Sequence, residues 1–413
     1  MFERIIMAQT ESDIFWIANP NTSCTCDIGK MAVDGAKTNL YFTGRTSGGH
    51  GFMTKISSLG IQQGIKNFGG FDWQYYTGRA CDMRGSDVCH ATGWNDNLFV
   101  PIYGADFTAN TTYRSHFWRG SGGSIGLGIY TASGAGIYSG VNYICGQWLE
   151  FAEGAPTGIT RGWIARINGG SMGWSVVWPS DYQAAFTDCA IMPNGNLVAV
   201  GPNWLNGDAS MIVIFNPTTG AVIAQKKVVS LLGINSVAVA SDNSIIFGGN
   251  GYNQAYIGKM NSTASTVIWG RRYSGGEITN VAIDSGGNVI AIGSISNNVI
   301  IYKFDPNGTL LWQRTWDSGG ADAGYGLAIG AGDCIYVKMK FGGSVIVAKL
   351  PSDGSLTGTY NGWTYAAGAA SFINGTFGTT NTAFSSEGTM ADYPYSAGNW
   401  SNGTITWNRT LMQ

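Results

Sequence analysis

A glycine near the end of an apolar, strand-like run recurs along this chain about once every 49 residues. The recurrences are Gly44, Gly93, Gly146, Gly201, Gly249 and Gly293, and the seventh equivalent position is Lys338. Self-similarity with a period of about 40–50 residues is typical of propellers and other repeat folds. The spacing therefore predicts one large array of repeated units.

The clearest unit of the array contains four short segments rich in Val, Ile and aromatic residues, the composition that strands favour. These segments are residues 278–283, 288–293, 298–304 and 309–316. Asp284–Gly287 and Asp305–Gly308 separate them and have the composition of tight turns. Four short strands joined by turns form one antiparallel sheet, which is one blade of a propeller.

Seven such copies predict an all-β fold, a seven-bladed β-propeller of four-stranded antiparallel blades that spans residues 21–360. The blades are expected at residues 27–68, 80–118, 124–178, 187–227, 235–273, 278–316 and 324–360. The third copy is the least regular. We expect its first strand at residues 136–138 and a long insertion at residues 147–160.

A ring of blades must be closed, because the first and last sheets otherwise leave open edges. The N-terminal segment, residues 1–20, contains a strand-like run at residues 13–18 that precedes the first copy. The last blade has only a weak candidate for its own fourth strand, at residues 354–358. We therefore expect Ile14, Phe15 and Trp16 to pair with the last blade and close the ring.

Residues 361–413 do not fit the repeat and form a C-terminal tail. The tail is rich in Gly, Thr, Ser and Ala, has few charges, and contains nine aromatic residues that need cover. This composition predicts short strands and turns. The favoured interpretation is an assembly tail that docks on another subunit, and the alternative is a tail that folds back on its own propeller.

Composition and charge exclude several classes of protein. Charged residues make up 12% of the chain, the formal net charge is −2, and no basic cluster exists, so a nucleic-acid partner is not expected. No apolar run is long enough to span a bilayer, so membrane insertion is not expected. The first ten residues do not resemble a signal peptide, and the seven cysteines have scattered spacings, which indicates reduced, buried thiols and assembly in the cytoplasm.

The sequence contains no catalytic motif, and we expect no metal and no cofactor. Only His50, His90 and His116 are available as histidine bases, and Cys24 and Cys26 are the nearest approach to a metal-ligand pair. Tryptophans in or beside the fourth strands are expected to pack between sheets. Aromatic residues in less regular stretches are weak candidates for ligand binding: Trp73, Tyr75, Tyr76, Trp94, Trp148 and Trp204.

The repeat resembles a known family at this point. The segment Gly286–Gly293, followed by Asp305–Trp312, is similar to bacterial β-propeller repeats of the SBBP type. Such propellers also occur in virion proteins of tailed bacteriophages, and the segment Tyr365–Phe372 is similar in style to the low-charge tails that follow them there. The propeller resemblance covers about residues 13–360, and the family carries no catalytic motif that transfers to this chain.

The resemblance implies a non-enzymatic structural or adsorption protein of a bacteriophage particle, assembled in the host cytoplasm and located in the tail or a fibre of the virion. Its partners would be other virion proteins and a glycan or protein of the host surface, with several copies in one assembly. A lectin-like, carbohydrate-binding propeller is the alternative. A propeller glycosidase or lyase is the third hypothesis, because sequence does not show whether two carboxylates share a cleft.

Overall fold

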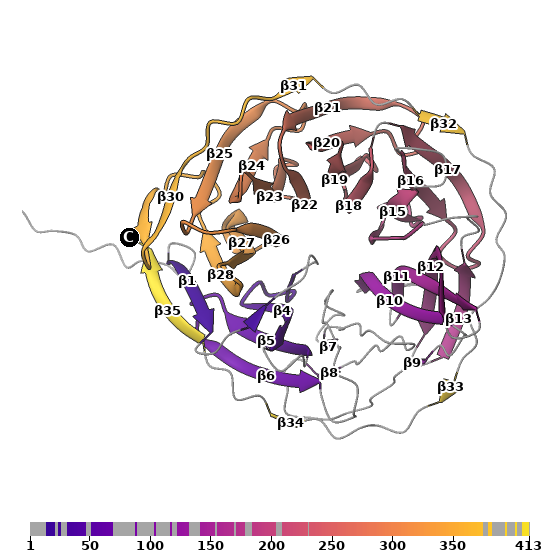
Figure 1. The fold of residues 1–413 in the computed structure, drawn as a ribbon, viewed down its shortest axis with the longest axis horizontal. Helices are drawn as coiled ribbons and strands as arrows, with labels where there is room; N and C mark the ends of the chain where they lie inside the picture. The colour runs from indigo at the N-terminus through magenta and orange to yellow at the C-terminus, as the bar shows by residue number, and fades with distance from the viewer. Residues whose placement is uncertain are drawn as a thin grey trace, which may run out of the picture.

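The computed structural model describes residues 14–20, 24–25, 31–46, 51–68, 87–88, 103–104, 116–117, 122–131, 141–152, 155–168, 171–177, 184–203, 209–229, 231–374, 379–381, 393–394, 401–402 and 407–412. The described residues form strands, turns and a single 3₁₀ helix, η2 (Ala331–Asp333). Antiparallel sheets are arranged around a common axis, as the view down the ring shows (Figure 1). The prediction of an all-β propeller is confirmed.

Blades 4, 5 and 6 follow the predicted repeat most closely, and consecutive strands within each are antiparallel neighbours. Blade 4 contains β14 (Asp188–Ile191), β15 (Leu197–Asn203), β16 (Ala209–Phe215) and β17 (Val222–Val229). Blade 5 contains β18 (Gly233–Val239), β19 (Ile245–Gly251), β20 (Gln254–Met260) and β21 (Val267–Ser274). Blade 6 contains β22 (Glu277–Ile283), β23 (Val289–Ile295), β24 (Asn298–Phe304) and β25 (Leu310–Asp317).

Blade 7 is completed by the N-terminal strand. It contains β26 (Ala323–Ile329), β27 (Ile335–Phe341), β28 (Ser344–Leu350) and, as its fourth strand, β1 (Phe15–Pro20). Trp16 lies opposite Lys349 in the antiparallel pairing of β1 with β28. The ring closes on the last blade as expected, but the residues paired with β28 are Trp16, Ile17 and Ala18, whereas Phe15 pairs with β35 and Ile14 precedes β1. The two ends of the propeller are therefore joined within one sheet.

The N-terminal blades are less regular. Blade 1 contains β2 (Cys24–Thr25), β3 (Ala32–Val33), β4 (Asn39–Thr46), β5 (Gly51–Ser57) and β6 (Gln62–Phe68), and both β2 and β3 pair with β4. The short strands β7 (Asp87–Val88), β8 (Tyr103–Gly104) and β9 (His116–Phe117) lie in the sector between blades 1 and 3 (Figure 1). This sector corresponds to blade 2, so the described strands are consistent with seven blades.

Blade 3 corrects two expectations. Its strands are β10 (Gly122–Thr131), β11 (Val141–Ala152), β12 (Ala155–Asn168) and β13 (Ser171–Val177). The first strand is therefore β10, and residues 136–138 lie outside the described residues. The expected insertion at residues 147–160 lengthens β11 and β12 into one continuous hairpin, in which Gln147 lies opposite Gly162 and Ala152 opposite Ala155.

The recurring glycines have a common steric cause. A Cβ atom on Gly201, Gly249 or Gly293 would lie 1.9, 2.0 or 1.8 Å from a carbonyl oxygen of the blade's first strand or the residues leading into it. In blades 5 and 6 the first strand has a β-bulge at this point, which brings its backbone toward the second strand. In blade 7 the first strand has the same bulge, between Gly324 and Gly326, and the residue opposite Gly324 is Met339. Met339 is therefore the seventh position of the glycine repeat, and the assignment of Lys338 was wrong by one residue.

Tryptophans of the fourth strands join neighbouring blades. The indole N–H of Trp174, Trp269, Trp312 and Trp16 donates to the carbonyl of Pro217, Pro306, Ser352 and Ser58, respectively, at 2.9–3.2 Å. Each acceptor lies in the turn that follows the third strand of the next blade. A glycine of that turn, with φ between 66° and 81°, lies under the indole ring in each case: Gly220, Gly308, Gly354 and Gly60. The expectation that these four tryptophans pack between sheets is confirmed.

The C-terminal residues encircle the ring. The segment begins with the hairpin β29 (Gly358–Tyr360) and β30 (Trp363–Ala367), and β30 pairs with the outer strand of blade 6. The chain then runs backwards around the outside of the propeller (Figure 1). The later strands are β31 (Ile373–Asn374), β32 (Thr379–Asn381), β33 (Tyr393–Pro394), β34 (Ser401–Asn402) and β35 (Trp407–Met412). We call strands β29–β35 the C-terminal belt.

Each described belt strand after β29 pairs with an outer part of the same chain. β31 pairs with β21, β32 with β17, β33 with β9, β34 with β6, and β35 with β1. These strands therefore follow the alternative interpretation, a tail that folds back on its own propeller, and docking of the tail on another subunit stays a prediction. The boundary also moves, because the belt begins at Gly358 rather than at residue 361.

Aromatic side chains of the belt insert between blades. Tyr365 is buried, with its ring centroid 4.7 Å from that of Trp316. Phe372 lies against Tyr273 of blade 5 and Tyr302 of blade 6, at centroid distances of 5.5 and 4.7 Å. The belt thus covers apolar surface that the blades leave open at their outer ends, and this burial stabilises the ring.

Candidate functional site

The aromatic ligand-binding candidates are mostly outside the described residues. This applies to Trp73, Tyr75, Tyr76, Trp94 and Trp204. Trp148 lies on β11, where its backbone is opposite Ser124 of β10 and Arg161 of β12. The described structure therefore brings no second member of the set to Trp148, and these six residues stay a prediction.

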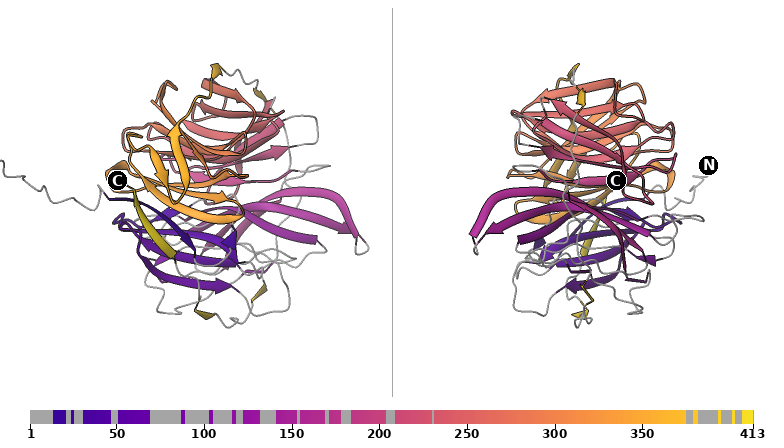
Figure 2. Two further views of the ribbon diagram at one scale, coloured as in Figure 1. Left: turned by 60° about the vertical axis from the view of Figure 1, so that its left-hand side comes forward. Right: turned by 90° about the vertical axis from the view of Figure 1, so that its right-hand side faces the viewer.

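The lengthened hairpin of blade 3 is the main departure from the ring. The second and third strands of blades 4, 5, 6 and 7 have seven residues each, whereas β11 has 12 and β12 has 14. In both views of Figure 2 the magenta strands of blade 3 reach well beyond the other blades on one side of the ring. The hairpin therefore presents backbone and side chains away from the propeller body.

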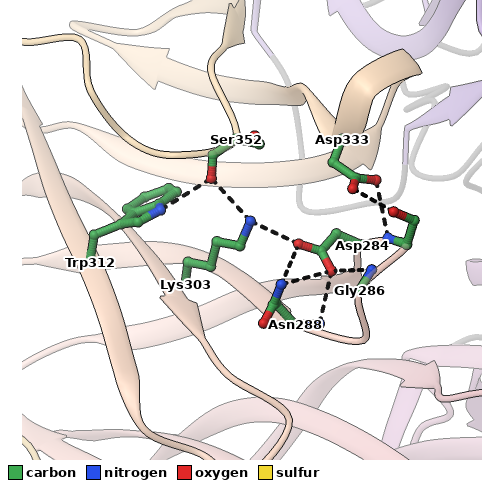
Figure 3. Close-up of polar contacts among 8 residues, drawn as sticks. Asp284, Gly286, Asn288, Lys303, Trp312, Asp333 and Ser352 are labelled. Atoms are coloured by element: carbon green, nitrogen blue, oxygen red, sulfur yellow. Dashed lines mark hydrogen bonds and ion pairs between the residues drawn. The ribbon is translucent and has the colours of Figure 1, made fainter.

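The opposite face carries the turns after the first and third strands, and there blades 6 and 7 share a polar cluster (Figure 3). The carboxylate of Asp284 accepts hydrogen bonds from the backbone N–H of Gly286 at 3.0 Å and of Asn288 at 2.8 Å. Its second oxygen lies 2.8 Å from Nζ of Lys303, which also donates to the carbonyl of Ser352 in blade 7 at 3.0 Å. This ammonium thus links two blades.

A second contact of the cluster joins the same two blades (Figure 3). Ser285 donates its backbone N–H and its hydroxyl to the carboxylate of Asp333, at 3.1 and 2.6 Å. The turn of blade 6 and η2 of blade 7 are therefore held together. The Trp312 indole shares the Ser352 carbonyl with Lys303, at 3.2 Å.

Burial and hydrogen bonding act in opposite directions on Asp284. Burial by itself would raise the pKa of this carboxyl, but hydrogen bonds from Lys303 and Asn288 outweigh it and hold the pKa below its ordinary value. The side chain of Asp284 is 2% exposed. An ionised carboxylate whose oxygens are occupied by fixed donors serves as a structural anchor and is poorly suited to proton transfer.

The corresponding lysine of blade 5 forms a looser pair, with an aspartate two residues further along its turn. Lys259 lies 3.4 Å from Asp242, whose side chain is 58% exposed. Sequence reasoning placed Asp284 and Asp305 in turns bonded to nearby backbone, and both are. It missed the lysine partners, although a Lys next to the last residue of the third strand recurs at Lys259, Lys303 and Lys349.

A further polar link lies on the inner strands and was also missed. Asp188 of blade 4 is buried and accepts hydrogen bonds from the Ser236 hydroxyl at 2.9 Å and the Val237 N–H at 2.8 Å, both in blade 5. The bulge residues extend this pattern, because Thr187 donates to the Ile234 carbonyl and Thr279 to the Gly324 carbonyl. These bonds connect neighbouring blades near the axis of the ring.

The outer rim carries an exposed aliphatic side chain at the fourth-strand bulge of each of three consecutive blades. Ile223, Ile268 and Leu311 are each 52% exposed. All three lie at β-bulges near the start of the fourth strand, in the part that the belt does not pair with. Bulges of this kind protect an open strand edge from unwanted pairing.

The cysteine thiols and the candidate metal ligands lie partly within the described residues. Cys24, Cys145, Cys189 and Cys334 are buried and form no disulfide, as expected. Within these ranges no three His, Cys, Asp or Glu side chains gather in a way that could hold a metal ion. His50, His90 and Cys26 lie outside the described residues, and His116 lies on β9. Among the residues described, no helix is long and apolar enough to cross a membrane.

Comparison with known proteins identifies the fold alone. No protein-family model matches the chain, and no curated protein is significantly similar to it in sequence. The hydrazine synthase of Kuenenia stuttgartiensis is similar in structure at a TM-score of 0.52 and 10% identity, covering 80% of this chain and 97% of that chain. The Dos1 propeller gives a TM-score of 0.49 at 11% identity, covering 84% and 97%. The protein described as YCF48 bound to D1 peptide gives 0.47 at 12%, covering 82% and 97%.

Proposed function

We propose that this chain is a non-enzymatic structural or adsorption protein of a bacteriophage particle, in which the propeller is a rigid platform for assembly or host contact. The observation that carries the proposal is the β11–β12 hairpin, which projects from a ring whose described outer strands are otherwise mostly paired by the belt. A projecting element on a closed scaffold is suited to reach a partner without deforming the scaffold. The phage setting is supported by the resemblance of the repeat and the tail to phage propellers.

The absence of catalysis is part of the proposal. The carboxylates of Asp284 and Asp305 accept hydrogen bonds from turn backbone, and Asp188 accepts them from the neighbouring blade. These three groups hold the ring together and are therefore not available as a pair for acid–base chemistry. We expect no release of reducing sugar from common polysaccharides, and turnover that is lost on changing one carboxylate would contradict this.

The test of the proposal uses particles and a shortened hairpin. Fab fragments raised against the chain should label purified phage particles at one defined place in electron micrographs. A variant in which residues 148–161 are replaced by a two-residue turn, so that the paired residues Gln147 and Gly162 flank the turn, should keep the circular dichroism spectrum of the propeller and lose incorporation or host adsorption.

A matched control replaces Gly342–Gly343, the short turn between β27 and β28, with Asn-Gly, and this should leave incorporation and adsorption unchanged. The absence of label from every particle would contradict the phage setting. Normal assembly and adsorption by the shortened variant would contradict the role of the hairpin.

A further inference from the structure

The place where the ring closes is held by both ends of the chain. β1 pairs with β28 to complete blade 7, and β35 pairs with the other edge of β1. The ladder between β1 and β35 covers six residue pairs, from Phe15 opposite Met412 to Pro20 opposite Trp407. The other described belt strands beyond β30 pair over two or three residues. The final strand therefore pairs with the propeller over more residues than any other described strand of the belt.

β35 also reaches across to blade 1. The guanidinium of Arg409 donates to the carbonyl of Leu59 at 2.6 Å. The neighbouring carbonyl of Ser58 accepts the indole N–H of Trp16 at 2.9 Å. One turn of blade 1 is thus bound by a residue near each end of the chain, and the side chains of Trp16 and Arg409 both pack on Gly60.

The beginning and the end of the belt meet at the same place. Asn361, in the turn between β29 and β30, donates its side-chain N–H to Asn19 of β1 at 3.3 Å, and it accepts a bond from the hydroxyl of Thr410 at 3.5 Å. Met412, the last residue of β35, is 4% exposed and lies in the apolar cluster that contains Ile17 and Trp316. Blades 6, 7 and 1 are therefore connected through β35.

We propose that β35 is a latch that locks the closed ring, so that the ring opens only after β35 has left β1. The order follows from the contacts of β35, which covers the outer edge of β1 and is itself held by Leu59, Asn361 and the apolar cluster around Met412. Release of β1 from β28 with β35 still attached would break all of these contacts in one step, whereas release of β35 first breaks them before β1 moves. The latch slows opening between blades 7 and 1 and makes the rate of unfolding depend on the last residues of the chain.

The first test measures unfolding rates of the full chain and three variants in denaturant. Removal of residues 407–413 should raise the unfolding rate at least about tenfold, and Met412→Ala should raise it at least about threefold, because interactions that form late in folding are absent from the transition state and act on the unfolding rate. Leu411→Ala is the matched control, since Leu411 is 43% exposed on the same strand, and it should change the rate less than about twofold. Equal rates for the truncated and full chains would overturn the proposal.

The second test uses the unaltered protein, so it holds even if the truncated chain fails to fold. Native-state hydrogen exchange in increasing denaturant should show the backbone amides of β35 opening at lower free energy than those of β1. Exchange of β1 before β35, or of both with the whole propeller in a single step, would overturn the order of opening that the latch requires.

Discussion

At the scale of single residues, the glycine repeat marks the closest approach of two strands within a blade. Gly293→Ala places a methyl group where 1.8 Å separates it from the Glu277 carbonyl oxygen, so the two strands must separate. We expect a loss of more than about 4 kcal/mol in the free energy of unfolding, or failure to fold. Gly35→Ala is the matched control: nothing lies within 4 Å of its added Cβ, and the unfolding midpoint should hardly change. Denaturant unfolding of the two variants measures the difference.

The Asp–Lys pairs of blades 5 and 6 predict different effects on stability and its pH dependence. The pKa of Asp284 is lower in the folded state than in the unfolded state. Its contribution to the free energy of unfolding is therefore complete above the unfolded-state pKa, near 4, and is lost as the pH falls through the folded-state pKa. Asp284→Asn should cost about 3 kcal/mol at pH 7, since it leaves the buried Lys303 ammonium with weaker partners. It should also flatten the loss of stability below pH 4. Asp242→Asn, in the exposed pair, should cost less than about 1 kcal/mol. Comparable losses in the two variants would contradict this account.

Lys338 is an unusual residue of the ring. It lies on β27, is 0% exposed, and its Nζ has no hydrogen-bond partner among the described residues. Burying an unpartnered ammonium is unfavourable, so Lys338→Met, which keeps the volume, should raise the free energy of unfolding by about 1–3 kcal/mol. Thermal and denaturant unfolding would measure the gain. A destabilised Lys338→Met variant would show that the ammonium has a role that packing does not explain.

At the scale of elements, the tryptophan contacts predict how neighbouring blades depend on one another. Trp269→Phe keeps an aromatic ring over Gly308 but removes the donor to the Pro306 carbonyl, which is 3.0 Å away. We expect a loss of about 1–2 kcal/mol, because the carbonyl is left without this donor and the smaller ring fills less of the space. Hydrogen exchange should show weaker protection of the backbone amides first in β21 and in the turn at residues 305–308. A uniform change over all blades would contradict a local contact.

How far the elements could be predicted depends on the distance over which they pair. Strand β24 was predicted with its exact bounds and β23 to within two residues, because apolar runs and a turn encode the hairpin locally. The belt strands were not placed, because β31 or β32 has two or three residues and pairs with a strand about a hundred residues or more away. The aromatic content of the tail showed that its side chains must be buried. An apolar surface on a partner chain and one on the tail's own blades would bury them equally well, so the sequence did not distinguish the two. The Asp284–Lys303 pair was missed because it joins a turn to a different hairpin.

At the scale of the whole molecule, the chain forms a ring closed by its N-terminal strand and encircled by its C-terminal belt. Ring closure places β1 between β28 and β35, so both ends of the described chain share one sheet. The belt adds a fifth strand next to the outer strands of blades 1, 4, 5, 6 and 7, which leaves fewer strand edges open to other chains. This arrangement suits a protein that presents the β11–β12 hairpin while resisting unfolding.

The central claim is that the belt binds the propeller of its own chain. The most direct test is the double variant Lys227→Cys with Thr380→Cys, because these residues are paired neighbours in β17 and β32. Copies labelled with ¹⁴N and ¹⁵N are mixed, folded together and oxidised, and the cross-linked peptides are analysed by mass spectrometry. We predict disulfide-linked peptides that carry one isotope only, in a monomeric protein. Peptides of mixed isotope in covalent dimers would show that the belt binds a second copy and would contradict the account.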